Sequence, residues 1–158
     1  MRSKFRRAAP LCAVLGIAVL AGCGGEDEDP LTKREFVAVA NSICTAADKE
    51  VVQRLSTYMQ EQPNGGAGQT QAQLFAGAVE DILLPAAEGK IQEIGSLQPP
   101  PADERRIGAF LGEMEAGVEA VERTAPTYEP LKASLYEFEK RFFPAGRIAG
   151  EYGIDDCR

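Results

Sequence analysis

Apolar residues return at three- and four-residue steps through most of the chain after residue 31. This spacing is the period of one face of an α-helix, and no stretch alternates with the period of two that a half-buried strand requires. Four segments carry the pattern, which predicts an all-α fold. Their apolar faces are formed in order by Phe36, Ala40, Ile43, Ala47, Val51, Leu55 and Tyr58, by Phe75, Ala78, Val79, Ile82, Ala86 and Ile94, by Ile107, Phe110, Leu111, Met114, Val118 and Val121, and by Leu131, Leu135, Phe138, Phe142, Ala149 and Tyr152.

Capping patterns mark where the first two helices begin. Thr32 is followed three residues later by Glu35, and Thr70 is followed three residues later by Gln73. Each pair is a capping box, in which the two side chains satisfy each other's free backbone N–H groups. We therefore expect helices to start directly after these two threonines, with the glycine-rich stretch 63–68 as the loop between them.

Two prolines interrupt the helical pattern from inside. The third helix is expected from about residue 103 to 124, and the fourth from about 127–130 to a helix-ending glycine at 153. Pro85 in the second helix removes one backbone hydrogen bond, so it predicts a kink at about residues 81–85 or a division into two shorter helices, and Pro144 predicts a kink in the fourth helix. With mostly short connections, the sequence predicts an antiparallel four-helix up-down-up-down bundle with proline-kinked second and fourth helices.

The N-terminal segment has the order of a bacterial lipoprotein signal. Four basic residues within positions 2–7 precede an apolar run of about 14 residues, too short to span a membrane and typical of a signal peptide. The run ends in Leu20-Ala21-Gly22-Cys23, which fits a lipobox: a branched apolar residue, two small residues and the cysteine that receives lipid. The alternatives are an uncleaved anchor or an ordinary secretory signal with an accidental cysteine.

The lipobox divides the chain into three parts. Residues 1–22 are expected to be the signal peptide, residues 23–31 an acidic flexible tether, and residues 32–158 the helical bundle domain. Lipid on Cys23 would hold the domain at the cell membrane, on its extracytoplasmic face.

The mature chain is strongly acidic. Cleavage after residue 22 removes four basic residues and no acidic one, which leaves 13 basic and 24 acidic residues and a formal charge of −11. Such a chain is a poor binder of nucleic acid, because phosphate contacts need Lys and Arg. It would also be repelled by anionic lipid headgroups. The simplest interpretation of the acidic charge, however, is that it keeps the domain soluble.

Two cysteines remain once Cys12 has left with the signal and Cys23 carries lipid. Cys44 and Cys157 would then lie in an oxidising compartment, where leftover cysteines most often pair. The alternatives are two free thiols or a redox-active pair, although the chain contains no Cys-x-x-Cys motif. Cys44 lies beside Ile43, and we expect it at the edge of the first helix's apolar face. To meet Cys44, the tail after Gly153 would have to fold back along the first helix.

Candidate chemistry is sparse. The chain has no histidine, which excludes a histidine-based nucleophile, a His-ligated haem and a Glu-x-x-His metal site. Glu115, Glu119 and Glu122 share one helical face and could bind a hard cation such as calcium, although a solvated helix face is the plainer interpretation. Asp155 and Asp156 are expected to form a turn or a local cap. We predict no enzyme, no catalytic residue and no cofactor.

Phenylalanine is the other group that could form a site. These residues could line an apolar ligand cavity between the helices, although at helical spacing they are first of all core. The residues concerned are Phe36, Phe75, Phe110, Phe138, Phe142 and Phe143.

Several short motifs recur together in this chain. They are Leu31-Thr32 with Glu35-Phe36, Ile43-Cys44, Pro100-Pro101 with Glu104, and Tyr152-Gly153 with Asp156-Cys157. In this combination the chain resembles a group of uncharacterised small lipoproteins of high-GC Gram-positive bacteria. The resemblance implies an exported helical domain, favours a Cys44–Cys157 disulfide, and supplies no activity.

Together these features predict a lipid-anchored cell-envelope protein. Its domain is expected to be a non-catalytic binding or structural module whose partner is an unidentified envelope protein or small ligand. The alternative is a carrier of a small apolar ligand held between the bundle helices.

Overall fold

The computed structural model describes residues 29–61, 70–124 and 135–158. Within these ranges every regular element is helical and none is a strand, as the sequence predicted. The lipobox residues Leu20 to Cys23 and the expected start of the fourth helix at 127–130 lie outside the described residues. No helix in the described part of the chain is long and apolar enough to cross a membrane.

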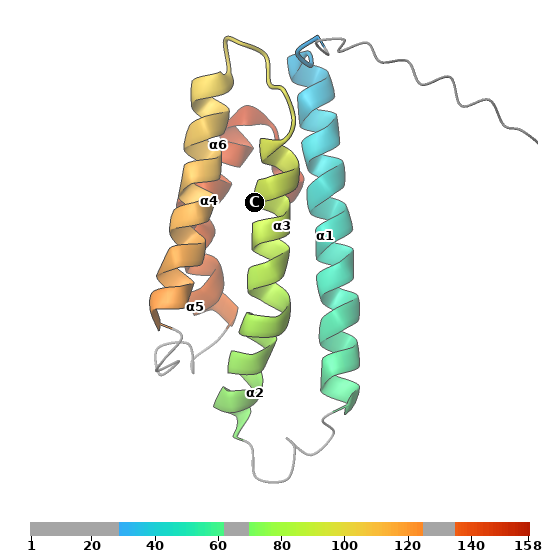
Figure 1. Ribbon diagram of the computed structural model, residues 1–158, viewed down its shortest axis with the longest axis vertical. Coiled ribbons are helices and arrows are strands. Elements are labelled where there is room, and N and C mark those ends of the chain that lie inside the picture. The colour runs from blue at the N-terminus through green and yellow to red at the C-terminus, as the bar shows by residue number, and fades with distance from the viewer. Residues whose placement is uncertain (1–28, 62–69, 125–134) are drawn as a thin grey trace, which may run out of the picture.

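Four helical segments pack against one another (Figure 1). In Figure 1, α1 runs down one side, α2 and α3 lead back up beside it, α4 runs down again, and α5 and α6 lie behind. Contacts join α1 to α3, α3 to α4, and α4 to α6. The elements are α1 (Lys33–Glu61), α2 (Gln71–Ala78), η1 (Val79–Leu83), α3 (Leu84–Gly95), α4 (Glu104–Thr124), α5 (Leu135–Glu139), η3 (Lys140–Phe142), α6 (Phe143–Tyr152) and η4 (Asp155–Cys157).

Both predicted capping boxes are present. The backbone N–H of Glu35 donates to Thr32 Oγ1 (3.4 Å), and the N–H of Thr32 donates to a Glu35 carboxylate oxygen (2.9 Å). The hydrogen bonds from the Thr32 side chain and backbone lower the pKa of Glu35. Thr70 and Gln73 repeat the exchange at the start of α2, at 3.3 and 2.8 Å.

The core is divided into two clusters along the bundle. The first gathers around Phe36 and Phe110, both fully buried, and joins α1, α4 and α6. The second lies around Val79 and Val121 and joins α4 to η1, α3 and α5. Cys44 is a full member of the first cluster with no exposed surface, so the prediction that it lies at the edge of the helix face is wrong. The periodicity could not show this, because the C-terminal tail covers Cys44 from outside the four-helix pattern.

The second helix is distorted where Pro85 predicted a kink. The chain stays helical from α2 to α3, but residues 79–83 form a turn of π-helix, in which the Leu84 N–H donates to the Val79 carbonyl. Pro85 has no N–H and cannot donate to the Asp81 carbonyl four residues earlier. The wider π-helical turn takes up this missing bond without ending the helix.

The fourth helix is divided rather than simply kinked. The Phe143 N–H donates to the Lys140 carbonyl, which closes the 3₁₀ turn η3 between α5 and α6. Pro144 then lies in the first turn of α6, where its missing N–H leaves no bond unmade. Gly153 ends α6 as predicted, with a left-handed backbone (φ 103°) and its N–H donating to the Ala149 carbonyl (2.9 Å).

Candidate functional site

The C-terminal tail is fastened to α1 by a disulfide. Cys44 and Cys157 are joined across 113 positions of sequence, with their Cα atoms 5.3 Å apart. This confirms the predicted pairing and the predicted return of the tail along the first helix. Cys44 is fully buried and Cys157 is partly buried, so the bond is covered by the surrounding side chains.

Polar side chains of α1 hold the same tail. Asn41 donates from its amide nitrogen to the Gly153 carbonyl (3.4 Å) and accepts from the Asp156 N–H (2.9 Å). The Thr45 hydroxyl donates to an Asp156 carboxylate oxygen (3.2 Å). Asp155 and Asp156 therefore belong to a short 3₁₀ turn, which confirms the turn that the sequence predicted there.

Tyr152 joins three helices beside this tail. Its hydroxyl donates to an Asp103 carboxylate oxygen (2.8 Å), its ring meets Phe36 edge-on, and the Lys33 ammonium lies 4.3 Å from the ring centroid. Burial, and then the bond to Asp103, raises the pKa of Tyr152 to about 12. The phenol therefore stays protonated and keeps its donor role throughout the neutral range.

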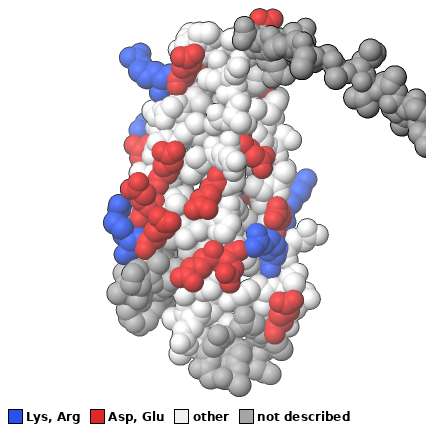
Figure 2. Space-filling model, viewed as in Figure 1, with Lys and Arg blue, Asp and Glu red and all other residues white. Residues whose placement is uncertain are grey.

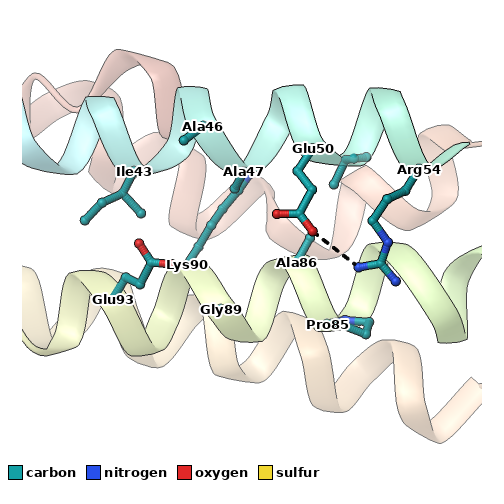
Figure 3. A pocket seen from close by; sticks show the side chains of 11 residues that line it. Ile43, Ala46, Ala47, Glu50, Arg54, Pro85, Ala86, Gly89, Lys90 and Glu93 are labelled. Atoms are coloured by element: carbon teal, nitrogen blue, oxygen red, sulfur yellow. Dashed lines mark ion pairs between the residues drawn. The ribbon is translucent and has the colours of Figure 1, made fainter. Parts of the chain in front are cut away.

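A groove of about 190 Å³ lies between α1 and α3. Small residues of both helices, among them Ala47 and Ala86, line it together with charged side chains (Figure 3). Glu50 pairs with Arg54 along α1 at 3.7 Å, and Lys90 of α3 pairs with Asp48 of α1. The charged residues that line the groove are two acids, Glu50 and Glu93, and two bases, Arg54 and Lys90.

Arg54 reaches from this groove to the π-helical turn. Its guanidinium donates to the backbone carbonyl of Asp81. That carbonyl is the one that lost its N–H partner to Pro85. Arg54 therefore links α1 to the π-helical turn of the second helix.

Replacing Arg54 with methionine should lower the free energy of unfolding by about 1 kcal/mol, because a backbone acceptor loses its donor. Chemical denaturation measures the loss. The loss should shrink in the Pro85→Ala background, because alanine at position 85 supplies the missing N–H. Arg123→Met, which removes an exposed pair with Glu119, is the matched control and should change stability by less than about 0.5 kcal/mol. An equal Arg54→Met loss in both backgrounds would contradict this role.

A second groove, of about 360 Å³, lies between α3 and α4. Figure 2 shows acidic side chains spread over these two helices on the viewed face. Ile91 and Val118 supply apolar surface inside the groove. The three predicted metal-site candidates line it, together with a fourth glutamate from α3. The acidic lining residues are Glu88, Glu115, Glu119 and Glu122.

These carboxylates do not converge on a point. Among the residues that the structure describes, no group of three or more cysteine or acidic side chains is arranged to hold a metal ion. Glu119 instead pairs with Arg123 one turn later on α4, at 3.3 Å. The helical spacing correctly predicted that Glu115, Glu119 and Glu122 lie on one face of α4. In the structure these three residues form the wall of a groove.

The phenylalanines proposed for a ligand cavity fill the core. Phe36 and Phe110 have no exposed surface, and Phe138 is 9% exposed. Phe75 and Phe142 pack against the second cluster. Phe143 points away from the core and is 52% exposed. The interpretation of Phe36, Phe110 and Phe138 as core is therefore confirmed, and the ligand carrier stays a prediction.

Some contacts of the structure could not be predicted from the sequence patterns. Asn41 and Thr45 occupy ordinary polar positions of a helix, and only the fold brings the tail to them. The Arg54 contact had one usable signal, because Pro85 marks a carbonyl that needs another donor. Comparisons of the chain with protein-family models, with curated proteins and with solved structures find no match.

Proposed function

We propose that this chain is a lipid-anchored, non-catalytic protein of the bacterial cell envelope, whose helical domain binds or supports a partner outside the cytoplasm. The lipobox Leu20-Ala21-Gly22-Cys23 carries the proposal. The Cys44–Cys157 disulfide supports it, because structural disulfides persist in oxidising compartments and are rare in the cytosol. The absence of histidine from the sequence supports a non-catalytic role.

The packing supports a finer description of the domain. We infer an antiparallel up-down-up-down bundle whose second and fourth helices are shaped by Pro85 and Pro144. In support, each helical segment contacts the one before it, from α1 to α3, α4 and α6. The π-helical turn lies just before Pro85 and the 3₁₀ turn just before Pro144. The disulfide-tied tail returns to α1 and closes the arrangement.

Lipidation is tested by expressing the full chain in a Gram-positive host fed an alkyne-tagged fatty acid. The wild type should carry the tag and sediment with the membranes, because multiply acylated cysteine anchors stably. Cys23→Ala should lose the tag and leave the membrane fraction. Cys12→Ala is the matched control, because Cys12 lies in the removed segment, and it should behave as the wild type. An untagged wild type, or a Cys23→Ala chain that stays tagged, overturns the proposal.

A further inference from the structure

Two aromatic rings lie together on the outer surface of α5 and α6. Tyr136 is 54% exposed and Phe143 is 52% exposed. Their ring centroids are 5.9 Å apart, with the rings edge-to-face. The neighbouring aromatic residues face the other way, since Phe138 is buried and Phe142 packs against the core. Among the described aromatic residues, these two alone are more than half exposed.

Basic side chains lie on the same outer surface. Lys140 has 56% of its side chain exposed and Arg147 has 67%. Their ion pairs with Glu137 (4.0 Å) and Glu151 (2.8 Å) are exposed, and pairs of this kind contribute little, so both cations remain open to other partners. The exposed positions recur at three- and four-residue steps and form what we call the α5–α6 outer face: Tyr136, Glu139, Lys140, Phe143, Pro144 and Arg147.

Aromatic rings beside lysine and arginine have the chemistry of a membrane interface. Tyrosine and phenylalanine bury their rings at the level of the lipid headgroups, and flanking cations meet anionic lipids. The α3–α4 groove has the opposite character, because four glutamates line it and an anionic surface would repel them. The outer face itself carries one acid, Glu139, beside Lys140 and Arg147, so an anionic bilayer repels this face much less than it repels the groove.

The position of the outer face along the bundle suits a membrane contact. Tyr152 packs against Phe36 and Lys33 in the first turns of α1, close to where the chain from Cys23 enters. Phe143 lies nine residues before Tyr152 on α6, or about 13 Å along the helix axis. The eight residues 23–30 can span up to about 26 Å. A lipid at Cys23 and the ring of Phe143 can therefore reach one bilayer surface together.

We propose that the α5–α6 outer face rests on the lipid surface. Tyr136 and Phe143 enter the interface, and Lys140 and Arg147 meet anionic headgroups. This proposal depends on the proposed lipid anchor, which keeps the face at a high local concentration near the membrane. The face then makes a second, weaker contribution to membrane binding. The domain then lies on its side, with the acidic α3–α4 groove turned toward the surroundings.

The chain has no tryptophan, so a single substitution provides a fluorescent reporter without background. The full-length lipidated protein carrying Phe143→Trp is reconstituted into vesicles of phosphatidylglycerol and phosphatidylcholine in equal parts. Its emission should move to shorter wavelength, and brominated acyl chains should quench it by about twofold or more, as expected for a ring at the interface. Val52→Trp is the matched control, because Val52 is 68% exposed on α1, and its emission should not change.

The role of the cations is tested on the same reporter. Lys140→Glu with Arg147→Glu should weaken the Phe143→Trp quenching on the anionic vesicles. The pair of substitutions should leave it unchanged on phosphatidylcholine alone. Equal quenching of both reporters, or none at Phe143→Trp, overturns the lipid contact. A shift of the Phe143→Trp emission in native membranes but not in pure lipid vesicles also overturns the lipid contact, in favour of a protein partner.

Failure of the anchor and failure of the face give different results. If Cys23 carries no lipid, the wild type fractionates like Cys23→Ala, and the anchor proposal fails. The Phe143→Trp reporter, measured on Cys23→Ala protein with excess anionic vesicles, still reports on the face. Quenching there supports the face without the anchor. A lipidated chain whose Phe143→Trp reporter remains unquenched overturns the face and leaves the anchor in place.

Discussion

Removing the Cys44–Cys157 disulfide should lower the free energy of unfolding by about 4–5 kcal/mol, the largest loss we expect from any single change. The bond spans 113 positions of sequence, and closing so long a loop removes many conformations from the unfolded chain. Cys157→Ser is the preferred variant, because Cys157 is only partly buried, whereas a hydroxyl at position 44 would be buried in the core. Denaturant titration measures the loss as a shift in midpoint.

Reduction of the wild type provides the control for this prediction. A thiol reductant should destabilise the wild type by a similar amount, and it should have no effect on Cys157→Ser. Agreement between the two routes would show that the loss comes from the bond and not from the introduced serine. A change below about 1 kcal/mol by both routes would mean that the unfolded chain is already constrained, and it would contradict the prediction.

Gly117→Ala should cost about 1–3 kcal/mol of stability, although alanine favours a helix over glycine by about 0.5–1 kcal/mol. Gly117 is buried on α4 beneath the ring of Phe142. A Cβ there would lie 2.7 Å from two ring carbons of Phe142 and 3.1 Å from the Arg141 carbonyl oxygen. The ring is held in turn by Phe138, with centroids 5.2 Å apart, so it cannot move away freely.

Gly112→Ala is the matched control on the same helix. Gly112 is exposed, and nothing lies within 4 Å of the Cβ that alanine would add. This substitution should stabilise the domain by about 0.5–1 kcal/mol, so the two changes should have opposite signs. Phe142→Leu should reduce the cost of Gly117→Ala, because a smaller side chain leaves room. A Gly117→Ala variant as stable as Gly112→Ala would show that the close contact between α4 and η3 is relaxed in solution.

The sequence was most informative where one residue type has a strong local effect. Thr32 and Thr70 predicted helix starts because each could exchange hydrogen bonds with the residue three positions later. Gly153 predicted a helix end because glycine takes a left-handed backbone without strain. Apolar spacing identified the α4 face well, because the helix is regular and its whole stripe meets the core.

Where two remote segments meet, local patterns were insufficient. Cys44 seemed peripheral by periodicity, yet the C-terminal tail buries it completely. Pro85 predicted a disturbance but could not say whether the helix would bend, break or widen, because that outcome depends on how Arg54 and the core hold the turn. The candidate glutamates were placed correctly along α4, whereas the groove beside them depends on where α3 packs.

The disulfide also determines how the domain carries mechanical load. A pull between residue 29 and Arg158 travels along the backbone to Cys44, crosses the sulfur–sulfur bond, and leaves through Cys157. Residues 45–156 lie outside that covalent path and bear no tension. Most of α1, all of α2 to α6, and the two grooves would therefore keep their shape while the ends are stretched. Only residues 33–44 of α1, and Arg158 beyond Cys157, would have to yield.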